Sequence, residues 1–193
     1  PLMLDSVYEH LLDEPLQVYA RAETVEALKT HLFNDVLWPD FSRIPSPEAA
    51  VIRFNVVAPG DTVQVGERRV LCVDVHHSVP ALGYVLQGDG RTVAFSGDTT
   101  TNDTLWPVLN AFERVDVLVI EVSFPDALEE LATSSGHYCP TTLARDLKRL
   151  DHRSDIWLTA MKPGEEHRIY KELIDAVPDR QVRWLTSGDY FEL

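Results

Sequence analysis

The feature that most constrains the fold is a change of hydrophobic period along the chain. Apolar residues recur at every second position in four short runs, which span residues 51–57, 61–75, 81–87 and 91–97. Period two is typical of half-buried strands. Beyond Asp98, strand-like runs alternate with helix-like runs. A meander of strands followed by this β-α alternation predicts a mixed α/β fold.

The same patterns predict the other elements. Helices are expected over residues 4–11, 22–33, 105–112, 140–150 and 165–177. Further strands are expected over residues 16–20, 115–122, 156–160, 181–186 and 189–193. The segment 34–50 holds three prolines and several apolar anchors, so we expect an ordered loop. The Asp89-Gly90 pair predicts a hairpin, because glycine readily takes a positive φ.

Length, charge and cysteine content narrow the class of protein. The 193 residues, 45% of them hydrophobic, are enough for one domain with a sizeable core. The formal net charge of −14 repels phosphate backbones and argues against a DNA-binding protein. Cys72 and Cys139 cannot form a framework of several disulfides, and the sequence has no signal peptide or membrane-length apolar run. We therefore expect a cytoplasmic location and no membrane partner.

Polar side chains follow three of the predicted strands. His76 and His77 end one run, Asp98 ends the next, and Glu121 lies in a strand that is followed by a loop containing His137. Strand ends converge at one edge of an α/β sheet, so these residues can meet although they are far apart in sequence. Imidazole and carboxylate groups are the ligands of zinc and other divalent cations in hydrolases. The pattern is thus compatible with a metal-dependent hydrolase site.

Each of these residues also has a purely structural interpretation. His76 and His77 alternate faces of a strand, so one of them must point away from any site. Asp98 can be a turn former or a helix cap, and His137 can cap the helix that follows it. Glu121, inside an apolar strand, can be a buried structural carboxylate. Serine-hydrolase and phosphate-loop chemistry are disfavoured, because the chain has no Gly-x-Ser-x-Gly, Walker-type or dinucleotide glycine motif.

Taken together, these segments resemble the metallo-β-lactamase fold superfamily over nearly the whole chain. "HHSVPALGYVL" resembles the stretch in which a metal-binding His precedes a Gly-Tyr, which matches His77 and not His76. "VAFSGDTT" resembles the strand that leads to the metal-bridging aspartate, here Asp98. "IEVSFPD" followed by "SSGHYCPTTLARDL" is similar to the class II cyclic-nucleotide phosphodiesterase branch, in which a Gly-His-x-x-Pro segment supplies a His near the leaving group, here His137.

The resemblance implies a metallo-β-lactamase-like αββα sandwich, with residues 1–193 forming a single, partial domain. The first metal motif of the family, His-x-His-x-Asp-His, is absent from these residues. The opening "PLMLDSVYEHLLDEPLQVYA" resembles the family segment immediately downstream of that motif, so we expect the N-terminal strands and four of the ligands to be missing from this sequence.

A second departure lies in "TAMKPGEE", where the corresponding family segment reads Thr-His-x-Lys-Pro. Ala160 occupies the position of an expected metal-binding His and has no donor atom. The resemblance implies one or two divalent metal ions, with zinc expected. Because the missing His serves the second metal, we expect the second site to be weakened.

The activity implied by the resemblance is a metal-dependent phosphodiesterase that acts on 3′,5′-cyclic nucleotides. In that picture His77 binds the first metal, and Asp98 bridges the two metals. His137 acts as general acid or holds the phosphate, Glu121 orients a ligand or a proton path, and Lys162 reaches the substrate phosphate. Asp98, Glu121 and His137 are therefore the catalytic candidates, and His137 and Lys162 the candidates for substrate binding.

Two alternatives stay open. One is an endonuclease that processes the 3′ end of tRNA, although this chain has "GHYCP" where those enzymes have a "GHST"-like loop, and its acidic charge suits a small phosphodiester better than RNA. The other is a non-catalytic regulatory or binding protein that keeps the fold without the ligand at Ala160. Apolar residues near the N-terminus and at Leu37-Trp38-Pro39 are compatible with a homodimer interface or with packing inside one subunit.

Overall fold

The computed structural model describes residues 10–191. The chain divides into two compact units, residues Pro1–Ala58 and Pro59–Leu193. A single domain over residues 1–193 therefore stays a prediction. The helix expected over residues 4–11 lies almost entirely outside the described residues.

The first unit is a small βαβ arrangement. Strand β1 (Leu16–Ala20) leads into helix α2 (Ala22–His31), and β2 (Ile52–Val56) returns parallel to β1. Half-buried positions of both strands pack on a local core that includes Phe33, Phe41 and Ile52. The sequence-based assignment of residues 51–57 to the meander is thus wrong. An alternation of apolar and polar residues indicates a half-buried strand, but it does not indicate which other strand lies beside it.

The loop of residues 34–50 is ordered, as predicted. Phe41 is 4% exposed, and its carbonyl accepts a hydrogen bond from the Ile52 amide. The Trp38 amide in turn donates to the Leu32 carbonyl. Buried aromatic anchors and backbone hydrogen bonds therefore replace regular structure in this segment.

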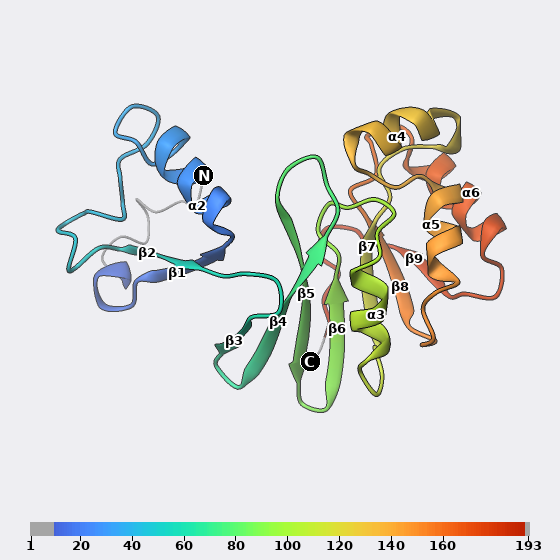
Figure 1. The fold of residues 1–193 in the computed structure, drawn as a ribbon, viewed down its shortest axis with the longest axis horizontal. Coiled ribbons are helices and arrows are strands. Elements are labelled where there is room, and N and C mark those ends of the chain that lie inside the picture. Colours follow the sequence, from blue (N-terminus) through green and yellow to red (C-terminus); the bar gives the residue numbers. More distant parts are fainter. Residues whose placement is uncertain (1–9, 192–193) are drawn as a thin grey trace. The chain divides into compact units, whose positions relative to one another are not determined.

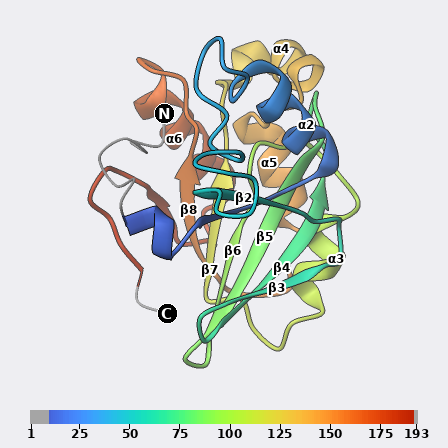
Figure 2. The ribbon, with the colours of Figure 1, turned by 90° about the vertical axis from the view of Figure 1, so that its left-hand side faces the viewer.

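The second unit is built on a seven-stranded sheet with the order β3-β4-β5-β6-β7-β8-β9. The strands are β3 (Thr62–Val65), β4 (Arg68–Val75), β5 (Ala81–Gly88), β6 (Arg91–Phe95), β7 (Val117–Glu121), β8 (Asp155–Thr159) and β9 (Val182–Trp184). Pairs from β3 to β6 are antiparallel, and pairs from β6 to β9 are parallel. In Figure 2 strands β4 to β8 follow one another across the sheet. The predicted change from meander to β-α alternation falls at β6.

The β5–β6 hairpin has the turn that the sequence predicted. Gly88 pairs with Arg91, which leaves Asp89 and Gly90 as a two-residue loop. Their φ angles are +46° and +76°. Positive φ at both central positions is typical of a type I′ turn, whose twist matches that of the flanking strands.

Helices cover one face of this sheet (Figure 1). They are α3 (Leu105–Asn110), α4 (Glu129–Ser135) after the short helix η1 (Asp126–Leu128), α5 (Pro140–Leu147) and α6 (Glu166–Ala176). Apolar residues of α3, α5 and α6 form one buried core with β4 to β8, including Leu109, Leu118, Leu143, Ile156 and Ile169. The mixed α/β prediction is confirmed.

Two local predictions differ from the structure. Helix α4 was not predicted, because its sequence "EELATSS" is short and has little apolar periodicity. Residues 189–191, expected to begin a strand, form no regular element. Phe191 instead packs on a second apolar cluster, with Val93, Val117 and Val119, on the other face of the sheet.

Strand directions explain how distant residues reach one edge. Strand β4 is antiparallel to β5, which is antiparallel to β6, so β4 and β6 run in the same direction. Strands β7 and β8 continue parallel to β6. The carboxyl ends of β4, β6, β7 and β8 therefore lie at a single edge of the sheet.

Among residues 10–191, no helix combines the length and apolar character needed to cross a membrane.

Candidate metal centre

Three predicted site residues meet at this edge. His77 follows β4, Asp98 follows β6, and His137 lies in the loop between α4 and α5. One potential ligand atom from each of them lies within 4.8 Å of the other two. The imidazole rings of His77 and His137 contact edge to face, with centroids 4.8 Å apart. The convergence predicted from strand ends is thus present in the structure.

Of the two adjacent histidines, His77 belongs to the cluster and His76 does not. His76 is exposed, and its backbone carbonyl accepts a hydrogen bond from the Thr100 amide at 2.8 Å. Neighbouring residues at a strand end point in opposite directions, so only one of the two can enter the cluster.

The ring of His77 is oriented by a backbone carbonyl. Its Nδ1 lies 2.9 Å from the carbonyl oxygen of Gly136, to which it donates, and Nε2 is left as the lone-pair nitrogen. Gly136 has a φ of +78°, and a Cβ there would lie 2.6 Å from the Ser78 nitrogen and 3.0 Å from the His77 Nδ1. Only glycine allows this close approach.

Asp98 is placed by a similar glycine. Gly97 has a φ of +62°, and a Cβ at this position would lie 2.7 Å from the carbonyl oxygen of Leu82. The turn directs the chain out of β6 and leaves the Asp98 side chain exposed beside the two histidines. A carboxylate in that position can contribute oxygen to a cation held by the imidazoles.

His137 forms an ion pair with a buried carboxylate. Its Nδ1 lies 2.9 Å from Oε1 of Glu121, which is fully buried, and 3.2 Å from the Ser123 hydroxyl. Glu121 also accepts hydrogen bonds from the Thr99 amide and the Ser123 hydroxyl, both at 3.1 Å. Burial raises the pKa of Glu121, and the hydrogen bond to Glu121 raises the pKa of His137. The hydrogen bond to Glu121 therefore favours the protonated form of His137.

This donor set fits a divalent cation. His77 and His137 each bind a carbonyl or carboxylate oxygen through Nδ1, so Nε2 is the second nitrogen of each ring, and that of His77 lies 3.5 Å from the Ser78 hydroxyl. Asp98 adds a carboxylate. Imidazole nitrogens fixed by an oxygen acceptor are the usual environment of metal-ligating histidines.

Ala160 lies at the same edge and contributes no ligand. The residue before it accepts a hydrogen bond from the Val122 amide at 3.1 Å, and the Lys162 amide donates to the Ser123 carbonyl at 3.1 Å. Residue 160 is thus held next to the strand end that carries Glu121. Ala160 has a φ of +62°, a left-handed conformation that is uncommon for a residue with a Cβ.

Phe124 is a neighbour of the cluster that the sequence analysis did not find. Its ring centroid lies 5.8 Å from that of His137, and the Nζ of Lys162 lies 5.0 Å from the Phe124 centroid. Ser123 and Thr99, which bind Glu121, were also missed. Small hydroxyl residues beside a strand end are too common to mark a site by sequence alone.

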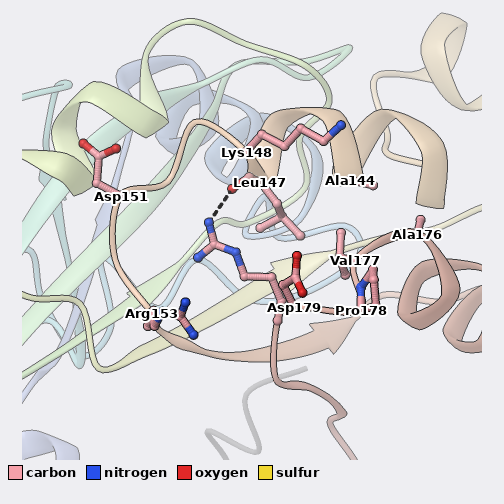
Figure 3. A pocket seen from close by; sticks show the side chains of 10 residues that line it. Ala144, Leu147, Lys148, Asp151, Arg153, Ala176, Val177, Pro178 and Asp179 are labelled. Atoms are coloured by element: carbon pink, nitrogen blue, oxygen red, sulfur yellow. Dashed lines mark hydrogen bonds between the residues drawn. The ribbon is translucent and has the colours of Figure 1, made fainter.

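A separate cavity of about 370 Å³ lies between the ends of α5 and α6 (Figure 3). Its lining mixes both charges, with Lys148 and Arg153 beside Asp151 and Asp179. Arg180 donates to the carbonyls of Leu147 and Leu150 at 3.0 and 2.7 Å, so it caps the C-terminal end of α5. None of the three clustered residues lines this cavity.

Comparison with known proteins identifies the family. The profile described as "Beta-lactamase superfamily domain" matches residues 3–158. The chain belongs to the β-lactamase superfamily. A curated relative from Yersinia pestis, named "Probable 3′,5′-cyclic-nucleotide phosphodiesterase", is 27% identical over 157 residues, which cover 74% of this chain and 46% of the relative. The chain thus spans about half the length of this β-lactamase superfamily relative.

Solved structures identify the fold as the metallo-β-lactamase fold. Unliganded yeast PDE1 has a TM-score of 0.76 and 17% identity, covering 91% of this chain and 59% of that one. The metallo-β-lactamase fold protein YhfI from Bacillus subtilis has a TM-score of 0.70 and 18% identity, covering 91% of this chain and 64% of that one. The chain therefore has the metallo-β-lactamase fold, and this fold implies divalent-metal binding.

Proposed function

We propose that this protein is a phosphodiesterase that hydrolyses 3′,5′-cyclic nucleotides with the help of bound zinc. The observation that carries the proposal is the position of the His137–Glu121 pair, whose imidazole lies beside His77 and Asp98. A metal centre next to a positioned acid is the arrangement that phosphodiester hydrolysis needs. The name of the Yersinia pestis relative supports this substrate class.

In this proposal His77 and Asp98 hold the metal. A bound zinc ion supplies Lewis acidity, lowering the pKa of a water and offsetting charge on the phosphoryl oxygens. The carbonyl of Gly136 keeps Nε2 of His77 facing the centre through its hydrogen bond to Nδ1. A second metal would be held weakly, because Ala160 has no donor atom.

His137 is the residue that handles the proton. Glu121 and Ser123 fix its Nδ1, so Nε2 is the atom that faces the reacting groups. We expect the pair to deliver a proton to the ribose oxygen that leaves phosphorus. Because burial keeps Glu121 away from water, the carboxylate acts through His137 and does not contact the substrate.

The proposal also covers the size of the substrate, the cellular location and the oligomeric state. The net charge of −14 favours a small phosphodiester over DNA or RNA as substrate. We also propose a cytoplasmic location and a homodimer. The 68% exposure of Leu37 and 84% exposure of Val36 in the first unit support the homodimer.

Metal analysis combined with kinetics tests the proposal. The purified protein is measured for zinc per chain and assayed with cyclic AMP, cyclic GMP, bis(p-nitrophenyl) phosphate and precursor tRNA. We expect His77→Gln to lose zinc and activity together. His137→Gln and Glu121→Gln should keep zinc, and His137→Gln should lower kcat by about 10²- to 10⁴-fold. His152→Gln is the matched control, since His152 contacts the Leu109 carbonyl and not the cluster.

An Ala160→His variant separates the alternatives. We expect it to raise the zinc content per chain. Absence of metal from both forms contradicts the proposal. Bound zinc with no hydrolysis by either form supports a regulatory protein, and preferential cleavage of the precursor tRNA supports the endonuclease.

A further inference from the structure

Phe124 connects Lys162 to the metal centre. The Lys162 ammonium lies 5.0 Å from the Phe124 ring centroid, within the range of a cation–π interaction. The same ring contacts His137 with a tilt of 64° and a centroid distance of 5.8 Å. The Phe124 ring therefore contacts both the exposed Lys162 ammonium and the imidazole of the His137–Glu121 pair.

Lys162 keeps its charge available. The chain has 31 acidic residues against 17 Lys and Arg, yet Lys162 takes part in none of the salt bridges found within residues 10–191. Lys171 on α6, by contrast, pairs with Asp175. An aromatic face orients an ammonium without neutralising it, so Lys162 can attract an additional anion.

The backbone of Lys162 is anchored to the site. Its amide donates to the Ser123 carbonyl at 3.1 Å, and its carbonyl accepts from the Glu165 amide at 3.0 Å, just before α6. Ser123 is the residue that also contacts His137 and Glu121. Lys162 is therefore tied through the backbone to the strand end that carries the His137–Glu121 pair.

We propose that Phe124 and Lys162 form a phosphoryl-binding subsite, in which Lys162 donates to a non-bridging phosphoryl oxygen and Phe124 positions the ammonium. The subsite rests on the proposed function and names the part of the substrate that the protein recognises. A phosphodiester carries one negative charge, which one ammonium complements. The neutral nucleoside part of the substrate has no role in this contact.

Binding measurements on the purified protein test the subsite. The probes are adenosine 5′-monophosphate, inorganic phosphate and uncharged adenosine, titrated by calorimetry. Relative to the unmodified protein, Lys162→Gln should weaken the Kd of both phosphate probes about 5- to 10-fold, while Lys162→Arg retains most of the affinity. Phe124→Leu should weaken the binding of both phosphate probes about 2- to 5-fold, because the Lys162 ammonium loses its aromatic partner.

The controls separate a local contact from a general effect of charge. Adenosine binding should be the same in all variants, and Lys171→Gln, which removes one ammonium from the same unit, should change nothing. Circular dichroism and zinc content confirm that each variant is folded. Equal phosphate affinity in Lys162→Gln and the unmodified protein overturns the subsite, as does the absence of phosphate binding to the unmodified protein.

Different results would contradict the subsite and the proposed function. Phosphate binding that depends on Lys162, without hydrolysis of any cyclic nucleotide, supports the subsite and contradicts the phosphodiesterase. Hydrolysis of cyclic nucleotides with the same KM in Lys162→Gln contradicts the subsite alone.

Discussion

Ala160 combines an uncommon backbone conformation with a side chain that has no donor atom. Its φ of +62° places a residue with a Cβ in the left-handed region, which is mainly occupied by glycine, asparagine and aspartate. Hydrogen bonds of the residues on both sides, to Val122 and Ser123, hold it there. The strand end is thus held in an uncommon backbone conformation, and the alanine side chain offers no donor atom to a metal.

Replacing Ala160 with glycine should stabilise the protein. Removing the Cβ relieves about 1–2 kcal/mol of left-handed strain, whereas the added freedom of glycine in the unfolded chain costs about 0.5–1 kcal/mol. We expect Ala160→Gly to raise the free energy of unfolding in urea by about 0.5–1 kcal/mol. Ala144→Gly in α5 is the control and should lower it by about 1 kcal/mol or more. If both variants lose a similar amount of unfolding free energy, the backbone at Ala160 is not strained.

At the scale of elements, the start of β7 is joined to both of its neighbours by one aspartate. The Asp116 carboxylate accepts a hydrogen bond from the Thr92 amide at 2.8 Å and pairs with Arg114, and its side chain is only 15% exposed. The Asp116 amide donates to the Thr92 carbonyl, and the Asp155 amide donates to the Asp116 carbonyl, both at 2.9 Å. Asp116 therefore links the ends of β6, β7 and β8 that lie opposite the metal centre.

This aspartate should make stability depend on acid pH. Burial raises the pKa of Asp116, but the hydrogen bonds from Arg114 and Thr92 outweigh it and lower the pKa overall. Its contribution is therefore present above the unfolded-state pKa of about 3.9 and is lost as pH falls through the lower folded-state pKa.

We expect Asp116→Asn to lower the free energy of unfolding by about 1–2 kcal/mol at pH 7, with the difference shrinking below about pH 4. Urea unfolding measured from pH 7 to pH 2 checks this. Asp175→Asn, which removes an exposed partner of Lys171, should show little difference at any pH. A pH-independent loss in Asp116→Asn contradicts a role of the charged carboxylate.

The whole molecule is dominated by its acidic charge and its division into two units. A net charge of −14 creates a field that repels polyanions, whereas the proposed substrate, a monoanionic nucleotide, needs only the local charges of the proposed metal site and of Lys162. The overall charge thus disfavours the tRNA endonuclease alternative at the level of binding, before any chemistry.

We expect the protein to bind tRNA with a Kd weaker than about 10⁻⁴ M at about 0.15 M salt, because general nucleic-acid affinity comes from Lys and Arg contacts to phosphates. Electrophoretic mobility shift at rising protein concentration measures this. Micromolar binding that weakens steeply with salt contradicts the electrostatic argument and reopens RNA as a substrate.

The sequence by itself determined the mixed α/β class, the hairpin at Asp89-Gly90 and the strand ends that carry His77, Asp98 and Glu121. These depend on periodicity and turn chemistry, which are local properties of the chain. The resemblance stated from motifs agrees with the superfamily to which the chain belongs.

The tertiary structure alone decided which polar groups touch. It pairs β2 with β1 and not with the meander, buries Glu121 against His137, and holds Lys162 over Phe124. Residues 121 and 137 come from a strand and a loop, and residues 124 and 162 come from the segments that follow β7 and β8. Such contacts form only when packing of the core has brought those segments to one edge, so no local sequence pattern encodes them.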